Sequence, residues 1–351
     1  MEQVMVILAE MVRRDASDLF ITVGKPPVLK LDGRLTDLSG YKPYSQAETE
    51  AFAHQLFSSE RDYQVFLEQG EIDFSLSLNA IGRFRVNVFR QRGSCAVSVR
   101  RIYTVLPDPV ALGIPDSIMG LTGRSNGLIL VTGPAGCGKT TTLAALIDKI
   151  NHERACHVLT LEDPIEYLHR HGRSLVNQRE IGSDSRSYER ALRAALRQSP
   201  DVILIGEMRD LETIAIALTA AETGHLVLST LHTVGAAKTI DRIIDVFPPG
   251  QQQQIRIQLS TVLQAVVSQQ LLPGQAGSLV PAFEIMMVNN AIRNMIRDGK
   301  TPQIDGVIQT GTAQGMSTMD MSLARLLRDG LISRELALFH AVNPDAVLRY
   351  L

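Results

Sequence analysis

The chain has 351 residues, of which 45% are hydrophobic and 21% charged, and its formal net charge is −2. This length suggests two domains with sizeable cores, and the near-neutral charge argues against binding nucleic acid or an acidic surface through a global field. The cysteines, Cys95, Cys137 and Cys156, form no CxxC pair, which argues against a disulfide framework and favours a reducing cytoplasm. No secretory signal is visible, and no run approaches the roughly 18 to 20 apolar residues of a membrane span.

The first part of the chain predicts a small α+β domain over residues 1–104. Residues 1–20 carry apolar side chains at helical spacing, and a second helix fits 45–57. Short alternating runs predict strands at 18–23, 28–35, 72–78, 82–89 and 96–102. Residues 105–120 then concentrate proline and glycine, which is typical of a linker between domains.

The second domain, residues 121–351, has apolar strands that alternate with longer helices, the pattern of a parallel sheet. Strands are predicted at 127–132, 157–161, 202–206 and 226–230, and helices at 139–152, 187–197 and 211–222. The strands lack polar alternation, so both faces of the sheet should be covered. Beyond about residue 234 the chain is expected to be mostly helical. These features predict the α/β fold class.

A glycine-rich loop follows the first of these strands and matches the pattern G-x-x-x-x-G-K-[ST] without a mismatch. Its residues are Gly133, Pro134, Ala135, Gly136, Cys137, Gly138, Lys139 and Thr140, with Thr141 next. The glycines let backbone N–H groups point at phosphates, and the following helix adds its positive end. Lys139 should reach the β- and γ-phosphates, and Thr140 should bind Mg²⁺. The loop therefore predicts an ATP–Mg²⁺ site, and a glycine-rich turn that binds nothing is the alternative.

Two acidic segments follow other strands of the predicted sheet. The run VILIG leads into Glu207 at the carboxyl end of a strand, where parallel sheets place ligand groups, so Glu207 should join Thr140 at the metal. The segment LEDPIEY places Glu162, Asp163 and Glu166 directly after another strand. One carboxylate could orient or deprotonate the attacking water, but composition does not choose between Glu162 and Glu166. A solvated turn around the intervening proline is the alternative.

Two histidines flank the strand within TGHLVLSTLHT. His225 precedes the strand and His232 follows it. Taken alone, a histidine beside a strand is more often structural than functional. The extended chain between the two rings also holds them too far apart to share a metal ion.

These four elements, in this order, resemble the secretion-type motor ATPases, and most closely the type IV pilus retraction ATPases of the PilT/PilU family. The resemblance covers nearly the whole chain. LEDPIEY is similar to the Asp box of that family, VILIGE to its Walker B box, and TGHLVLSTLHT to its His box. Residues 291–298, AIRNMIRD, resemble the retraction-specific motif AIRNLIRE, with Met for Leu and Asp for Glu. No cysteine follows Cys156, which argues against the extension-type relatives with their tetracysteine metal subdomain.

The resemblance implies a PAS-like N-terminal domain, a RecA-like P-loop ATPase domain and a homohexameric ring, with ATP between the two domains. It makes Glu166 the water-activating glutamate and gives Glu162 and Asp163 supporting roles. It also implies that His225 and His232 sense or position the nucleotide.

The resemblance further implies that arginines of the N-terminal domain approach the phosphates. Arg85 and Arg100 align with the family pattern, Arg83 and Arg101 are close competitors, and Arg92 does not align cleanly. Arginine suits this role because its planar fork binds two phosphate oxygens and its charge never titrates away. The alternative is that these arginines form the solvent face of two strands.

Two further predictions concern three arginines on one predicted helix and a cysteine in the phosphate loop. Arg190, Arg193 and Arg197 share one helix face by their spacing, and could contact the site, a neighbouring subunit or only solvent. Cys137 lies in the phosphate loop, which predicts sensitivity to thiol reagents when no nucleotide is bound.

The function implied by the resemblance is an ATP-hydrolysing motor that powers type IV pilus retraction from the cytoplasmic face of the inner membrane. It would act on a membrane-embedded pilus platform protein, and ATP would close and open the two domains about the linker. One alternative is an accessory ATPase of the PilU type, working beside a paralogous retraction ATPase. Another is a nucleic-acid-translocating ATPase, but 5% aromatic residues and no tryptophan argue against a base-stacking channel.

Overall fold

The computed structural model describes residues 2–31, 33–57, 59–78, 81–103, 106–275 and 277–351. The chain forms two compact units. The first comprises Met1–Val105 and Pro164–Leu168, and the second comprises Leu106–Asp163 and His169–Leu351. The predicted domain limits at residues 104 and 105 lie outside the described residues. The sequence placed Pro164–Leu168 in the second domain, whereas in the structure this segment groups with the first unit.

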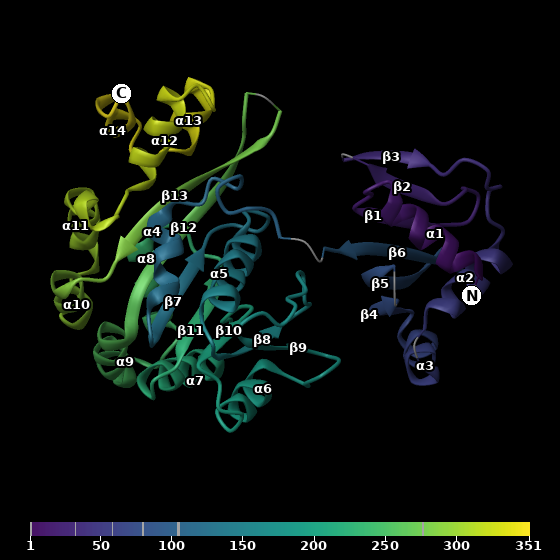
Figure 1. The fold of residues 1–351 in the computed structure, drawn as a ribbon, viewed down its shortest axis with the longest axis horizontal. Coiled ribbons are helices and arrows are strands. Elements are labelled where there is room, and N and C mark those ends of the chain that lie inside the picture. Colours follow the sequence, from purple (N-terminus) through teal and green to yellow (C-terminus); the bar gives the residue numbers. More distant parts are fainter. Residues whose placement is uncertain (1, 32, 58, 79–80, 104–105, 276) are drawn as a thin grey trace. The chain divides into compact units, whose positions relative to one another are not determined.

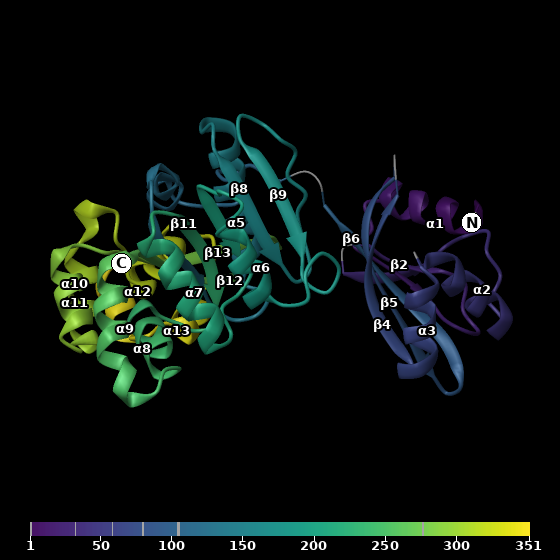
Figure 2. The ribbon, with the colours of Figure 1, turned by 90° about the horizontal axis from the view of Figure 1, so that it is seen from below.

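The first unit is an antiparallel sheet with helices packed on it (Figure 1). The strand order is β3-β2-β1-β6-β5-β4. The strands are β1 Asp18–Ile21, β2 Val28–Leu31, β3 Arg34–Asp37, β4 Glu71–Leu78, β5 Gly82–Gln91 and β6 Ser94–Ile102, and the helices are α1 Glu2–Arg13, α2 Gln46–Leu56 and α3 Glu60–Gln69. Alternate residues of β5, Phe84, Val86 and Val88, share one buried core with side chains from all three helices. Figure 2 shows these helices beside the sheet.

Local signals in the first unit explain where its elements begin and end. Ser45 and Glu48 form a reciprocal capping box that starts α2, and Gly70, with a φ of 80°, ends α3. The predicted helix over 1–20 is wrong beyond Arg13, because Asp15 adopts a φ of 55° and the chain then turns into β1. The predicted strand 28–35 divides into β2 and β3, and the sequence did not predict α3.

The second unit is built on a seven-stranded sheet with the order β13-β12-β7-β11-β10-β8-β9. The strands are β7 Gly127–Thr132, β8 His157–Glu162, β9 Leu175–Glu180, β10 Val202–Ile205, β11 Leu226–Leu231, β12 Leu263–Pro273 and β13 Leu279–Met287. All neighbouring strands pair in parallel except β12 and β13. The predicted α/β class is therefore confirmed.

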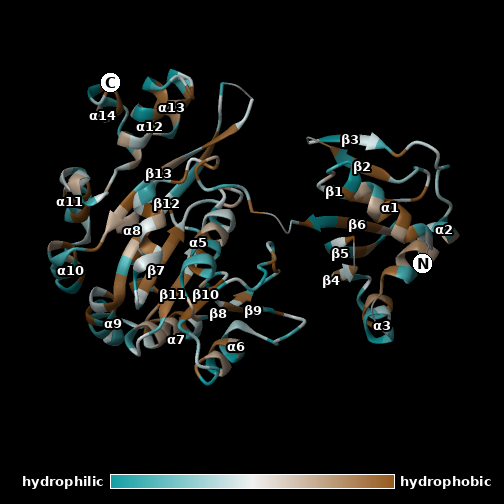
Figure 3. Ribbon diagram, in the orientation of Figure 1, coloured by the Kyte–Doolittle hydropathy of each residue, from teal (hydrophilic) through white to brown (hydrophobic). Residues whose placement is uncertain are grey.

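Helices cover both faces of this sheet. They are α4 Asp116–Met119, α5 Lys139–Glu153, α6 Tyr188–Ala195, α7 Leu211–Glu222, α8 Ala236–Asp245, α9 Pro249–Val262, α10 Asn290–Arg297, α11 Ile304–Thr310, α12 Met319–Arg328, α13 Arg334–His340 and α14 Pro344–Arg349. Leu128 and Leu130 of β7 face a core formed with α7, α8 and α9, whereas Ile129 and Val131 face a core formed with α5. The strands are correspondingly apolar along their length (Figure 3). This two-sided burial is why the strands show no polar alternation.

The region beyond residue 234 is mostly helical, as predicted, but the sequence did not predict its two strands. β12 and β13 pair from Ala265 with Met287 to Pro273 with Leu279. Their glutamine, leucine and methionine residues are good helix formers, so local propensity favours a helix. Pairing with neighbouring strands in the sheet outweighs that propensity. Short 3₁₀ turns, Gly120–Gly123, Thr301–Gln303 and Thr312–Gln314, connect other elements. None of the helices in the described part of the chain has the length and apolar character needed to cross a bilayer.

Candidate active site

The phosphate loop connects β7 to α5 at the carboxyl edge of the parallel strands. Gly133, Gly136 and Gly138 have φ values of 139°, 76° and 89°, which side-chain-bearing residues rarely adopt. A Cβ atom at Gly133 would lie 2.2 Å from the carbonyl oxygen of Gln269. The loop therefore needs glycine both for its backbone conformation and for its close approach to β12. Its backbone leads directly into the positive end of α5, which favours phosphate binding.

Lys139 is the first residue of α5 and is buried. Its ammonium nitrogen donates to the carbonyl oxygens of Gly133 and Pro134, each at 2.9 Å. The cation is thus held against the loop, where phosphate oxygens would compete with these carbonyls for it. Thr140 and Thr141 follow on the first turn of α5, as the motif predicts.

Gln269 of β12 braces this loop and was not predicted. Its Oε1 atom accepts a hydrogen bond from the Thr142 hydroxyl at 2.8 Å, and the side chain is buried. Its Nε2 atom lies 2.8 Å from where a Cβ atom of Gly138 would stand. Sequence reasoning missed Gln269 because the segment that carries it was expected to be helical.

Glu207 follows β10 at the same edge of the sheet. Its Oε1 atom forms an ion pair with Arg209, and its Oε2 atom lies 3.5 Å from Nε2 of His232. The hydrogen bond from Arg209 to Glu207 raises the pKa of that guanidinium. The Oε2 atom is buried and makes no hydrogen bond. A buried carboxylate oxygen of this kind suits a metal or a metal-bound water, so Glu207 and Thr140 are the side chains that could hold Mg²⁺.

The two predicted histidines lie at opposite ends of β11. His232 follows Leu231, which pairs with Thr132 beside the phosphate loop. His225 precedes the strand, where its carbonyl oxygen accepts from Gly127 N and its Nδ1 lies 2.9 Å from the Ala220 carbonyl oxygen. The strand between them spans on the order of 20 Å at about 3.3 Å per residue. The structure therefore brings His232, but not His225, to the phosphate loop and Glu207.

Glu162 ends β8 and is buried at the same edge. Its Oε1 atom accepts from the Thr160 hydroxyl at 2.6 Å and from Gln178 Nε2 at 3.1 Å. Asp163 and Glu166 are exposed. Glu166 belongs to the segment Pro164–Leu168, which groups with the first unit. In that unit Leu168 N donates to the Tyr103 carbonyl oxygen at 3.4 Å.

Tyr188, the first residue of α6, is a second residue that sequence reasoning missed. Burial raises the pKa of its phenol, and the negative charges of Asp163, Glu207 and Glu162 raise it further. The hydroxyl lies 2.7 Å from where a Cβ atom of Gly206 would stand, so glycine is required there. Tyr188 is thus a neutral donor close to the acidic residues of the site. No sequence motif marked it.

The structure groups some of the predicted arginines of the first unit. Arg85 and Arg100 are directly opposite each other on β5 and β6, so their side chains share one face of the sheet. Arg83 lies two residues from Arg85 and therefore on this face. Arg101 is directed to the other face, where it bonds Asp15. Arg92 lies in the β5–β6 turn, away from that group.

Acidic neighbours hold the two grouped arginines. Arg85 Nε lies 3.5 Å from Asp73, and Arg100 Nε lies 2.9 Å from Asp18. The Arg100 side chain is nonetheless 68% exposed, so much of its guanidinium can still take a ligand. The approach of these arginines to a nucleotide stays a prediction.

The remaining side-chain predictions have different outcomes. Cys137 is buried, and burial raises the pKa of its thiol, which argues against the predicted sensitivity to thiol reagents. Arg190, Arg193 and Arg197 are exposed, and Arg193 pairs with Glu189 at 2.9 Å. Arg190 and Arg193 lie on α6, whereas Arg197 lies beyond its end at Ala195, so the prediction of one shared helix face is wrong for Arg197.

Comparisons with known proteins agree with this arrangement. The family described as Type II/IV secretion system protein matches residues 73–322. The type IV pilus retraction ATPase PilT of Pseudomonas aeruginosa is 45% identical over 97% of this chain and 98% of its own length. The type IV pilus ATPase PilU of that organism is 40% identical, over 95% of this chain and 87% of its own. A crystal structure of the pilus retraction motor PilT with bound ADP has a TM-score of 0.92 at 46% identity, covering 98% of each chain.

A loop of this form binds nucleotide phosphates, and its place at the edge of a parallel sheet beside Glu207 is that of a P-loop ATPase. More narrowly, the chain belongs to the Type II/IV secretion system protein family, and its resemblance to the PilT/PilU group is confirmed. The retraction-type motif forms α10, where Ile292 and Ile296 are buried. Arg293 of this motif donates to the carbonyl oxygens of Ser260 and Thr261 at the end of α9.

Proposed function

We propose that this chain is an ATP-hydrolysing motor that powers type IV pilus retraction and twitching motility. The observation that carries this proposal is the match over 97% of the chain to a relative named a pilus retraction ATPase. The phosphate loop, Glu207 and the retraction-type motif on α10 support it, because all of them lie within residues 73–322, the range that the family matches.

ATP with Mg²⁺ is the proposed ligand. Lys139 and the loop N–H groups would bind the phosphates, and Thr140 and Glu207 would hold the metal, which would neutralise phosphate charge. Glu166 would accept a proton from the attacking water, with Glu162 and Asp163 shaping its surroundings. His232, 3.5 Å from Glu207, would orient that carboxylate.

The motor is proposed to work as a homohexamer at the cytoplasmic face of the inner membrane. Its membrane association would come through a pilus platform protein. Arg85 and Arg100 would complete the nucleotide site, since their shared face offers two guanidinium groups for phosphate oxygens. The PAS-like domain at 1–104 is part of this proposal. The predicted linker at 105–120 is not, because its residues from Leu106 group with the second unit, where Ile114 and Ile118 are buried.

The chemistry is tested by replacing Glu166 with glutamine in the purified full chain. The variant should bind ATP with unchanged affinity and lose turnover by roughly 100-fold or more, because the amide cannot accept the proton. Normal hydrolysis by the variant would show that another group is the base. Size analysis with and without ATP tests the hexamer.

A PilU-type accessory role is the second candidate, favoured by the 40% identity to that relative. Complementation separates the two roles. A retraction motor should restore pilus retraction to a strain that lacks its own motor, measured as pulling force or twitching. An accessory ATPase should restore it only when the paralogous motor is also present.

A further inference from the structure

One side chain contacts both ends of the loop that carries Glu166. The loop leaves the second unit after Asp163 and returns to it at His169. Gln178, on β9 at the edge of the sheet, accepts from His169 N through Oε1 at 2.8 Å. The same amide donates through Nε2 to Glu162 Oε1 at 3.1 Å. The two ends of the loop are therefore joined through a single amide.

A primary amide matches the chemistry of this contact. The His169 end presents an N–H donor and the Glu162 end presents a carboxylate acceptor. A primary amide offers an acceptor and donors on the same planar group, whereas an ionised carboxylate only accepts and an ammonium only donates. Glu162 is also fixed from a second side by the Thr160 hydroxyl at 2.6 Å. Gln178 therefore sets the distance between Glu162, where the loop begins, and His169, where it ends.

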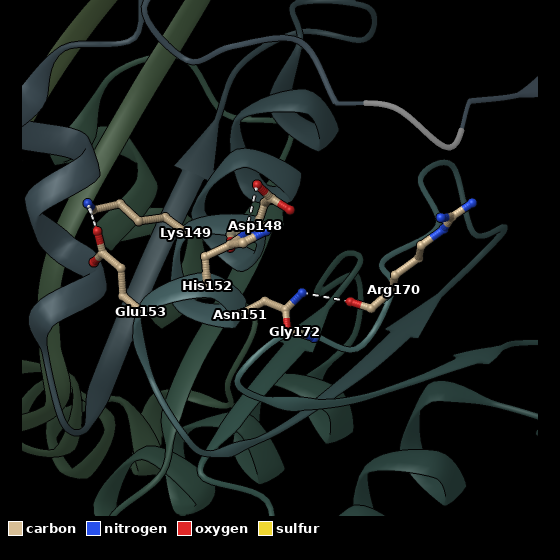
Figure 4. A network of polar contacts seen from close by, with 7 residues as sticks. All are labelled: Asp148, Lys149, Asn151, His152, Glu153, Arg170 and Gly172. Carbon is tan, nitrogen blue, oxygen red and sulfur yellow. Dashed lines mark hydrogen bonds and ion pairs between the residues drawn. The ribbon is translucent and has the colours of Figure 1, made fainter.

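A second amide holds the chain immediately after the loop (Figure 4). Asn151, near the end of α5, donates to the Arg170 carbonyl oxygen at 2.7 Å and accepts from Gly172 N at 2.9 Å. Its own carbonyl oxygen accepts from the N–H groups of Arg173 and Ser174. Since α5 starts at the phosphate loop, the path from His169 to β9 is attached to the helix that carries Lys139.

We propose that Gln178 is a positioning residue for Glu166. This inference rests on the proposed role of Glu166 as the base. By joining the two ends, Gln178 fixes where the loop that carries Glu166 leaves the second unit and where it returns. A misplacement of about 1 Å in a reacting group can cost on the order of 100-fold in rate, so loss of this amide should lower turnover without removing any phosphate contact.

The same strand supplies a matched control. Asn177, next to Gln178 in sequence, points to the opposite face of β9 and lies 2.9 Å from Nε2 of His157 through its Oδ1. Both side chains belong to the same edge strand, and the backbone of this strand pairs with β8 from Leu175 to Glu180. Replacing either should leave that backbone pairing in place. Of these two side chains, Gln178 is the one that bonds to the ends of the Glu166 loop.

The test compares Gln178→Met, Asn177→Leu and Glu166→Gln in the full chain. Steady-state hydrolysis gives kcat and KM, and binding of a fluorescent ATP analogue gives affinity. Gln178→Met should lower kcat by roughly 30- to 100-fold with KM and affinity within about twofold of the original protein. Asn177→Leu should keep kcat within about twofold. In a Glu166→Gln background, Gln178→Met should lower the single-turnover rate no further.

Three results would overturn the proposal. One is a Gln178→Met variant as active as Asn177→Leu. Another is a loss of ATP affinity equal to the loss of kcat, and the third is a further rate loss in the Glu166→Gln background. If the methionine variant does not fold, Gln178→Glu decides, since it keeps the length and acceptor but removes the donor and must show the same kcat loss. A fully active Glu166→Gln variant would instead refute the base assignment.

Discussion

Two loops leave the carboxyl edge of the parallel sheet, one after β7 and one after β8, and they are held in different ways. The phosphate loop has three glycines with positive φ and a lysine bonded to loop carbonyls, and Gln269 of β12 supports it from outside. The loop that carries Glu166 has exposed acids, and its ends are joined by Gln178 from another strand.

This difference shows which parts of an active site can be predicted from a short sequence pattern. Glycines, a lysine and a hydroxyl at fixed spacing identify the first loop in the sequence, although that pattern does not reveal its contact with Gln269. The ends of the second loop are joined by Gln178, which lies outside the pattern LEDPIEY, so that pattern alone left Glu162 and Glu166 as equal candidates. Experiments on each loop and on its supporting residues test whether the difference is real.

The largest expected effect is on the phosphate loop itself. Lys139→Ala removes the only charged group of that loop, and hydrolysis should fall by about 1000-fold because a preorganised charge in a buried site is lost. Steady-state ATPase rates measure it. If the variant keeps more than about a tenth of the activity, phosphate binding does not depend on the loop's own lysine, and the proposed difference between the two loops is wrong.

The next effect separates the two ends of β11. His232→Ala should lower turnover by roughly 10- to 100-fold, because Glu207 loses a neighbour 3.5 Å from its Oε2 atom. His225→Ala is the matched control and should leave turnover within about threefold, since His225 lies at the opposite edge of the sheet. Equal losses in the two variants would mean that His225 acts at a nucleotide after all, in a neighbouring subunit.

A smaller effect concerns the brace of the phosphate loop. Gln269→Leu leaves the Thr142 hydroxyl buried without its partner, which should cost about 1 to 3 kcal/mol of stability and about tenfold in nucleotide affinity. Thermal unfolding and ADP titration measure both quantities. Gln270→Leu is the control, because that side chain bonds His340 instead. Affinity that is unchanged in Gln269→Leu would show that the loop needs no support from β12.

The smallest expected effect is a pH dependence of protein stability that arises from His169, at the end of the second loop. Burial lowers the pKa of His169 below its ordinary value of 6.5, and its buried Nδ1 makes no hydrogen bond. Below about pH 6.5 the unfolded chain therefore binds more protons at this histidine than the folded chain does. The contribution of neutral His169 to the free energy of unfolding is complete above that pH and is lost as the pH falls. His169→Gln should weaken this loss, measured as urea unfolding at about pH 7.5 and about pH 5.5. An identical loss in both proteins would assign it to other groups.

The sequence predicted the sheet core better than its margins. Strands with both faces buried, such as β7 and β11, form continuous apolar runs whose limits are visible in the sequence. β9 is an edge strand of mixed polarity, and β12 and β13 consist largely of good helix formers, so neither local pattern indicated a strand. Gln178 and Gln269 lie on these unpredicted strands. Their roles were therefore hidden together with the strands that position them.

The grouping of Pro164–Leu168 with the first unit has a practical consequence for protein engineering. A fragment that stops at Val105 would lack a segment of its own fold, including Ile165, which is buried in the intact protein. A fragment that starts at Leu106 would retain Ile165 without the rest of the unit to which it belongs. The two halves of this motor are thus poor candidates for separate expression, and domain exchange between relatives should transfer residues 164–168 together with the N-terminal part.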